Sequence, residues 1–298
     1  MVDPAHADPH RPRVRLGRVG DARRAPRPAR HRPSPRAPRR PAEGPLTVDV
    51  ALTLDVEGDF GTRDLRGVDE VLPRLLDALD ERGVRATLFV VGEVARARPA
   101  AIREAARRGH AVASHSMTHP ALSRSAPAVR RAELRDSRAA LEDITGAPCE
   151  GFRAPYFDLP RDLGPLLEEA GYRWSSSKAP FSPVAGYRHL RATGAPHELA
   201  GSAVREFPVP RMLGLPIPEG LSYRRLFSPI ARWAGAPRVF YLHPYELLDR
   251  VEGFALPRWM RPFVTAGQGR VAEETLWRAI DGWRSAGARF VTLSAGAS

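Results

Sequence analysis

Two carboxylates and two histidines are the residues of this sequence with the clearest capacity for metal and acid–base chemistry. Asp55 and Glu57 directly follow an apolar stretch, and His115 and His119 lie four residues apart in the segment H-S-M-T-H-P. Two carboxylates this close repel each other unless a cation or a proton lies between them. Neutral imidazoles suit zinc and similar divalent ions. Two histidines with one carboxylate give three ligands and leave a position for water, as in catalytic metal sites.

Two further segments can complete such a site. Arg153 begins the segment R-A-P-Y, and an arginine there can pair with a carboxylate such as Asp55. The proline before Tyr156 fixes the backbone, so the N–H of Tyr156 can face a developing oxyanion. His243, in the segment L-H-P, has a side chain suited to proton donation near neutral pH. Each segment alone also has an ordinary structural interpretation, as an acidic turn, a polar loop, a surface arginine or a structural histidine.

The elements that must position these residues alternate between strands and helices. The patterns predict strands over 48–54, 87–91, 110–114, 151–153, 172–176, 204–209, 239–243 and 289–293, and helices over 68–82, 97–108, 128–145, 161–170 and 272–286. Such β-then-α repeats predict parallel strands, and a barrel or distorted barrel is the leading architecture. A doubly wound open sheet is the alternative, but no Gly-rich phosphate turn supports it.

In that architecture the four segments follow strand ends, where barrels place their active sites. Asp55 and Glu57, two residues apart, should face the same side of a strand. His115 and His119 would share one face if their loop takes a helical turn.

Together the segments resemble the polysaccharide deacetylase family, also called the NodB-homology or carbohydrate esterase family 4 group. The order of an acidic strand end, H-S-x-x-H-P, R-x-P-Y and a late L-H-P matches, and the resemblance covers roughly residues 46–295. The D-V-E-G-D variant is similar to the exopolysaccharide-biosynthesis branch. The resemblance implies a distorted (β/α) barrel of about seven strands. It also implies metal-dependent removal of the acetyl group from an N-acetylhexosamine-containing saccharide, with zinc as the expected ion.

The resemblance also implies a role for each matched residue. His115 and His119 match metal ligands, Asp55 the catalytic base and Arg153 the residue that holds it. His243 matches the general acid, and the backbone N–H of Tyr156 an oxyanion donor. Leu242 matches a residue that lines the acetyl pocket.

The sequence departs from the family pattern at two places. Where the family has adjacent aspartates, this chain has Asp55 and Glu57; we assign Glu57 as the third ligand, and Asp59 stays open as the alternative. Many relatives carry an aspartate after the aromatic residue of the fifth strand, whereas Trp174 is followed by Ser175 here, which predicts a missing support for Arg153. Trp174 can line the substrate pocket or belong to the core.

Composition limits the cofactors, partners and location. Cys149 is the only cysteine, so a thiolate zinc cluster is excluded. Residues 1–45 hold 12 Arg against three Asp and one Glu, which is +8 of the net +12 and leaves +4 for residues 46–298. With ten prolines, residues 1–45 are predicted to be a disordered tail, and residues 46–298 the deacetylase domain. No apolar run approaches the about 18 residues of a membrane span, and no secretory signal is evident, so a cytoplasmic location is expected.

Two alternative functions are also compatible with the sequence. The same site could hydrolyse a small cyclic amide or ureide, as in the allantoinase-like branch of the family. The chain could instead be a non-catalytic carbohydrate-binding protein, or a nucleic-acid-binding protein that uses the basic tail. We expect no stable nucleic-acid partner, because the tail lacks the interleaved aromatic residues that stack on bases.

Overall fold

The computed structural model describes residues 48–182, 187–188 and 194–294. The predicted tail over 1–45 lies outside the described residues, so the tail and the domain boundary beside it remain predictions. Among the helices of the described residues, none has the length and hydropathy to cross a bilayer.

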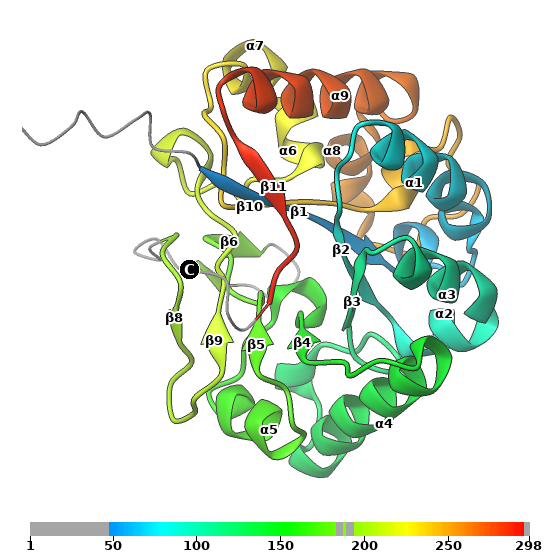
Figure 1. Cartoon of the computed structure of the whole chain (residues 1–298), viewed down its shortest axis with the longest axis vertical. Helices are drawn as coiled ribbons and strands as arrows, with labels where there is room; N and C mark the ends of the chain where they lie inside the picture. The colour runs from blue at the N-terminus through cyan, green and yellow to red at the C-terminus, as the bar shows by residue number, and fades with distance from the viewer. Residues whose placement is uncertain (1–47, 183–186, 189–193, 295–298) are drawn as a thin grey trace, which may run out of the picture. The chain divides into compact units, whose positions relative to one another are not determined.

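The main sheet is curled, with its helices on the outer side (Figure 1). Its strand order is β10-β1-β2-β3-β4-β5-β9-β8, with β11 beside β1. In chain order these strands are β1 (Asp49–Val56), β2 (Thr87–Val90), β3 (Ala111–Ser114), β4 (Gly151–Phe152), β5 (Trp174–Ser175), β8 (His197–Glu198), β9 (Arg205–Glu206), β10 (Val239–Leu242) and β11 (Arg289–Val291). A separate antiparallel pair is formed by β6 (Phe181–Ser182) and β7 (Tyr187–Arg188).

Seven strands, from β10 to β9 in the sheet order, pair in parallel, which confirms the predicted distorted barrel of about seven strands. β8, which is not among the predicted strands, pairs with β9 antiparallel. Of the strand predicted over 204–209, Arg205 and Glu206 form β9.

The helices correspond closely to the apolar periodicity. They are α1 (Leu72–Glu81), α2 (Gly92–Ala97), α3 (Pro99–Arg107), α4 (Pro127–Thr145), α5 (Leu163–Glu169), α6 (Leu221–Leu226), α7 (Ser228–Ala231), α8 (Arg261–Thr265) and α9 (Arg270–Ser285). A π-helical turn, η2 (Gly67–Val71), leads into α1, and the 3-10 turns η6 (Pro244–Leu247) and η7 (Arg258–Met260) follow β10. The single helix expected over 97–108 starts at Pro99, because α2 occupies the preceding turns.

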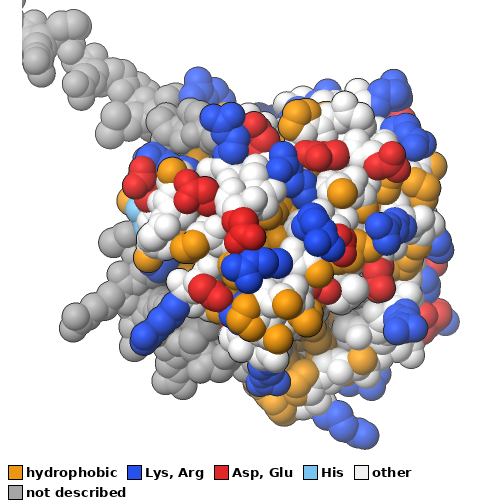
Figure 2. Space-filling model, turned by 90° about the horizontal axis from the view of Figure 1, so that it is seen from below, with side chains coloured by type: hydrophobic (Ala, Val, Ile, Leu, Met, Phe, Trp, Pro, Cys, Tyr) orange, Lys and Arg blue, Asp and Glu red, His pale blue; other side chains and the backbone are white. Residues whose placement is uncertain are grey.

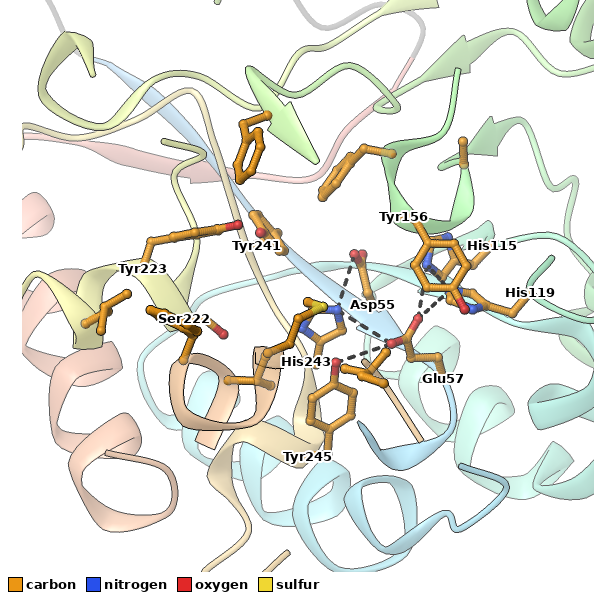
Figure 3. A pocket seen from close by; sticks show the side chains of 18 of the residues that line it. Asp55, Glu57, His115, His119, Tyr156, Ser222, Tyr223, Tyr241, His243 and Tyr245 are labelled. Carbon is orange, nitrogen blue, oxygen red and sulfur yellow. Dashed lines mark hydrogen bonds and ion pairs between the residues drawn. The ribbon is translucent and has the colours of Figure 1, made fainter. Parts of the chain in front are cut away.

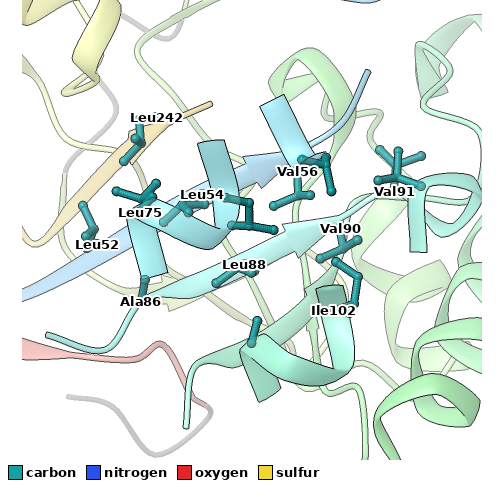
Figure 4. Packing of buried hydrophobic residues seen from close by; sticks show 14 of the residues in the cluster. Leu52, Leu54, Val56, Leu75, Ala86, Leu88, Val90, Val91, Ile102 and Leu242 are labelled. Carbon is teal, nitrogen blue, oxygen red and sulfur yellow. The ribbon is translucent and has the colours of Figure 1, made fainter. Parts of the chain in front are cut away.

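The core has two parts because the strands are buried on both faces. Leu52 and Leu54 of β1 pack outward against α1 and β2 in the larger cluster (Figure 4). Ala51 of β1 belongs to a smaller cluster on the inner face, with Phe89 and Tyr241. This alternation fixes which residues of each strand face inward, and so it fixes the direction of Asp55 at the end of β1.

Charged side chains of opposite sign are interspersed on the face shown in Figure 2. Among the described residues, pairs of opposite charge on single helices include Arg138 with Glu142 at 3.0 Å and Arg107 with Glu104 at 2.8 Å. Exposed pairs of this kind contribute little to stability and are typical of a solvated surface.

Candidate active site

A cavity of about 310 Å³ lies at the carboxyl ends of β1, β3, β4 and β10. Asp55 of β1 and Glu57, which directly follows that strand, point into it between His243 on one side and His115 and His119 on the other (Figure 3). The prediction that Asp55 and Glu57 share one face of the strand is confirmed, since both line the cavity. Residues from segments almost 190 positions apart thus meet at one edge of the sheet.

Glu57, His115 and His119 form the one group among the described residues whose ligand atoms converge as a metal site requires. Glu57 Oε2 lies 2.6 Å from His119 Nε2 and 3.4 Å from His115 Nε2. The two Nε2 atoms lie 3.3 Å apart. Ligand atoms at about 2.0 Å from a tetrahedral zinc ion are about 3.3 Å apart, so two of these three separations already fit.

The hydrogen bond of His115 leaves the correct nitrogen for a metal. Its Nδ1 lies 2.7 Å from the carbonyl oxygen of Arg153. A carbonyl oxygen only accepts, so Nδ1–H must donate, and Nε2 of the neutral ring keeps its lone pair toward Glu57. The donor set of one carboxylate and two imidazoles therefore fits a divalent cation.

Asp59, the alternative third ligand, is held elsewhere. Both of its carboxylate oxygens accept the backbone N–H of Gly67, at 3.0 and 3.1 Å. It does not line the cavity. Among the two candidates, Glu57 alone has the geometry of a ligand.

The loop that carries the two histidines is not helical, so the condition under which they would share a helix face is not met. Ser116 and His119 have left-handed backbones with φ of 64° and 62°. Buried Glu133 of α4 holds the loop in this conformation, because its carboxylate accepts the N–H groups of Met117 and Thr118, both at 2.8 Å. A fixed non-helical turn, and not one face of a helix, therefore brings His115 and His119 together.

Asp55 forms a buried ion pair with Arg153. Arg153 Nη1 lies 2.6 Å from Asp55 Oδ1, and the two side chains are 0% and 3% exposed. Nη1 also donates to Thr53 Oγ1 at 2.9 Å, and the guanidinium lies 4.0 Å from the ring of Phe89. The pairing predicted from the sequence is therefore present, and the arginine is part of the core behind the cavity.

The support expected to be missing at Ser175 is supplied by its neighbour. Arg153 Nη2 donates to Ser176 Oγ at 2.8 Å, and its Nε donates to the carbonyl of Ser176 at 2.9 Å. Ser175 Oγ lies 2.7 Å from Ser177 Oγ, which in turn accepts the N–H of Ala154 at 2.9 Å. Ser176 thus accepts from both Nε and Nη2 of Arg153, where many relatives are expected to carry an aspartate.

His243 is held by a buried carboxylate that follows it in η6. Its Nδ1 lies 3.1 Å from Glu246 Oε1, and its Nε2 lies 3.7 Å from Glu57 and 4.0 Å from Asp55. Burial opposes protonation of His243, but the bond to Glu246 and the charges of Glu57 and Asp55 outweigh burial and raise its pKa to about 9. The ring also stacks on Tyr245, with centroids 4.7 Å apart.

Glu246 is itself paired with Arg225 of α6 at 2.7 Å and accepts the hydroxyl of Ser222 at 2.7 Å. Burial opposes ionisation of Glu246, but the charge of Arg225 and the bonds from His243 and Ser222 outweigh it and lower its pKa to about 2. The histidine therefore faces a carboxylate that stays charged.

Two predicted pocket residues lie elsewhere. Leu242 is completely buried in the outer cluster, because strand alternation places Tyr241 and His243 on the cavity side of β10. Trp174 belongs to the inner core, edge-on to Phe89 at 5.8 Å between ring centroids. The expectation that Leu242 lines the pocket is therefore wrong, and of the two alternatives for Trp174 the structure shows the core one.

Tyr156 lines the cavity with its side chain, and its ring lies edge-on to His119, with centroids 4.6 Å apart. Tyr156 and Phe157 both have left-handed backbones, with φ of 57° and 55°. Such conformations cost about 1 kcal/mol or more for each residue and occur at functional loops.

Sequence reasoning missed Glu133, Arg225 and Glu246. The position of Glu246 three residues after His243 is a signal that could have found it, since a residue at this spacing can close a capping box. Arg225 and Glu133 carry no local signal, because each reaches the site from a helix distant in sequence.

Comparison with known proteins agrees with this site. Residues 48–175 match the family described as polysaccharide deacetylase. A chitooligosaccharide deacetylase of Sinorhizobium fredii is 44% identical over 85 residues, which cover 28% of this chain and 40% of the relative. A peptidoglycan-N-acetylglucosamine deacetylase of Bacillus cereus is 29% identical over 112 residues, which cover 38% of each chain. The matches thus span less than half of these relatives.

Solved structures share the fold. A presumed polysaccharide deacetylase from Mycobacterium smegmatis superposes with a TM-score of 0.52 at 23% identity, covering 88% of this chain and 98% of its own. A CE4 family pseudoenzyme from Bacillus anthracis gives a TM-score of 0.53 at 14% identity, covering 84% and 65%. The fold is the distorted barrel of these α/β proteins. The family match covers residues 48–175, which is less than half of the chain.

Proposed function

We propose that this protein hydrolyses the N-acetyl group of a saccharide that contains N-acetylhexosamine, releasing acetate. The observation that carries the proposal is the cavity itself. Glu57, His115 and His119, which we call the metal-type triad, lie there beside Asp55 and His243. Asp55 is paired with Arg153 and His243 with Glu246, and residues 48–175 match the polysaccharide deacetylase family. The named relatives that act on chitooligosaccharides and peptidoglycan support an N-acetylated saccharide as the substrate class.

The cofactor in this proposal is a divalent cation, with zinc as the ion, held by Glu57, His115 and His119. When bound there, the cation polarises the amide carbonyl and lowers the pKa of a water molecule. The hydrogen bond from His115 to the Arg153 carbonyl orients the ring for this purpose.

Asp55 is the base in the proposal and accepts the proton of the attacking water. Its Oδ1 is occupied by Arg153, so Oδ2 is the atom that faces the cavity side, where it lies 4.0 Å from His243. Arg153 balances the charge of the carboxylate and fixes its orientation.

His243 is the general acid and protonates the departing amine, because an amide nitrogen leaves poorly without a proton. The raised pKa of His243, with Glu246 behind its Nδ1, favours a protonated ring near neutral pH. The backbone N–H of Tyr156 is the proposed donor to the carbonyl oxygen as negative charge develops there.

We also propose that the deacetylase domain extends beyond residue 175 to the C-terminal part of the chain. The support is structural: β10 pairs with β1 from Ala51 to Leu54 and brings His243 to the cavity. The cytoplasmic location expected from the sequence stays a prediction.

The test is acetate release from N-acetylglucosamine oligomers by the purified protein, before and after chelation and with zinc or cobalt added back. We expect release that is lost on chelation and restored by metal. Absence of acetate release with any metal, together with opening of allantoin-like rings, would contradict the proposal and indicate the cyclic-amide alternative.

A further inference from the structure

The outer wall of the cavity differs sharply in chemistry from the metal-type triad. It comes from α6, η7 and α8, together with the segment that precedes η7. Six of its lining residues are apolar: Leu226, Leu256, Trp259, Met260, Phe263 and Val264. The indole N–H of Trp259 is the one hydrogen-bond donor on these six side chains. Ser222 and Tyr223 of α6 also line the cavity and carry hydroxyl groups, but the Ser222 hydroxyl already donates to Glu246. The six apolar side chains can satisfy few of the hydroxyl groups of a sugar.

The apolar residues lie at the open end of the cavity. Trp259 is 59% exposed and Phe263 53% exposed, whereas Asp55 at the inner end is 2% exposed. Large apolar side chains exposed beside one another usually mark a binding surface. Because this surface continues into the cavity, its occupant is part of the molecule that reaches the triad.

The direction of the substrate follows from the position of the triad. The scissile amide must lie beside Glu57 and Asp55 at the inner end, with the sugar on the nitrogen side of that bond. The part of the substrate that is most distant from the amide then lies against Trp259, Met260 and Phe263. That part is the group attached to the sugar, and the apolar wall favours a hydrocarbon at this position.

We infer that the substrate is an N-acetylated sugar with an apolar aglycone, a hydrocarbon chain that leaves the cavity over Trp259 and Phe263. This inference rests on the proposed function for the identity of the amide. A pyranose ring can stack on an indole, but Leu256, Met260 and Val264 offer no ring face, so a bare polysaccharide would leave most of the wall unused.

The experiment compares the methyl and octyl glycosides of N-acetylglucosamine below the micelle concentration. Acetate release gives kcat/KM, and calorimetry gives Kd independently of turnover. We expect kcat/KM and 1/Kd to be roughly tenfold higher for the octyl glycoside, the effect of about two buried methylene groups. The gain should reside in KM, because the chain contacts the enzyme equally before and during reaction.

Variants localise the effect. Trp259→Ser combined with Phe263→Ser should reduce the octyl-to-methyl ratio toward one. The matched control is Trp233→Ser, since Trp233 is 70% exposed but does not line this cavity. Circular dichroism melting of each variant checks that the fold is retained.

The possible results distinguish the inference of an apolar aglycone from the proposed deacetylase function. Equal kcat/KM and equal Kd for the two glycosides would overturn the inference, even with rapid acetate release. A gain seen with N-octanoylglucosamine and not with the octyl glycoside would also overturn it, because the chain would then lie on the acyl side. Tighter binding of the octyl glycoside without acetate release would support the apolar site and contradict the proposed function.

Discussion

The two sides of the cavity are built in different ways. The inner side consists of strand ends whose side chains are fixed by buried partners, as Arg153 fixes Asp55 and Glu133 fixes the histidine loop. The outer side consists of short helices with exposed apolar residues such as Trp259 and Phe263. The family match ends at residue 175, so it covers the triad and Asp55 but none of the outer side. We infer that the inner side carries the chemistry and that the outer side selects the substrate.

The largest expected effect is on the inner side. Asp55→Asn should lower kcat by a factor of about 10² to 10⁴ while metal content is unchanged, because proton transfer is lost and the triad is not. The control is Asp59→Asn, which alters a buried carboxylate outside the cavity and should keep most of the activity. Acetate release and metal analysis on the two variants check this; equal loss in both would remove the distinction between the carboxylates.

A stability effect should distinguish a buried from an exposed arginine. Arg153→Leu leaves Asp55 buried without its partner and should lower the free energy of unfolding by about 3 to 5 kcal/mol. Arg131→Leu removes an exposed pair with Glu169 and should cost less than about 1 kcal/mol. Urea denaturation of the two variants measures the difference. Similar values would show that the buried pair contributes no more to the free energy of unfolding than the exposed pair.

The ion pair between Glu246 and Arg225 should stabilise the fold less as the pH falls. Glu246 has a folded pKa of about 2, below its value in the unfolded chain, so its stabilisation is complete above about pH 4.5. It is lost as the pH falls toward 2, and amounts to about 3 kcal/mol at most.

Glu246→Gln should therefore be less stable than the natural protein at neutral pH, with a deficit that shrinks as the pH falls to about 2. Unfolding measured between pH 2 and 7 tests this. A deficit that is independent of pH would indicate that lost packing, and not the charge of Glu246, accounts for the change.

A smaller effect is expected at Ser176. Ser176→Ala removes the acceptor of Arg153 Nη2 and should cost about 1 to 3 kcal/mol, because a buried N–H is left unsatisfied. Ser175→Ala, which leaves the arginine bonds in place, is the comparison. If Ser175→Ala costs more, Ser175 and its serine partner, and not Ser176, provide the main support for Arg153.

The inner side could be predicted from the sequence because its signals are local. Apolar strands followed by polar residues, with a period of two, were sufficient to bring Asp55 and Glu57 to one face. The same period places Leu242 opposite His243, and the wrong prediction for Leu242 came from the resemblance, which does not take this alternation into account.

The outer side could not be predicted, because the sequence of its own segments does not indicate which part of the sheet they pack against. Trp259 and Phe263 reach the cavity through the path of the chain after β10, and Arg225 meets Glu246 across 21 residues. The left-handed backbone at His119 likewise depends on Glu133, which belongs to a different element. These features arise from packing between elements, which periodicity does not report.

We propose that Glu57, His115 and His119 together hold one divalent ion. The direct measurement is the metal content of the natural protein, Glu57→Gln, His119→Ala and Asp59→Asn after zinc loading and dialysis, by plasma mass spectrometry. We expect about one zinc per chain in the natural protein and in Asp59→Asn, and little or none in the other two. Undiminished zinc in Glu57→Gln and His119→Ala, or none in the natural protein, would contradict it.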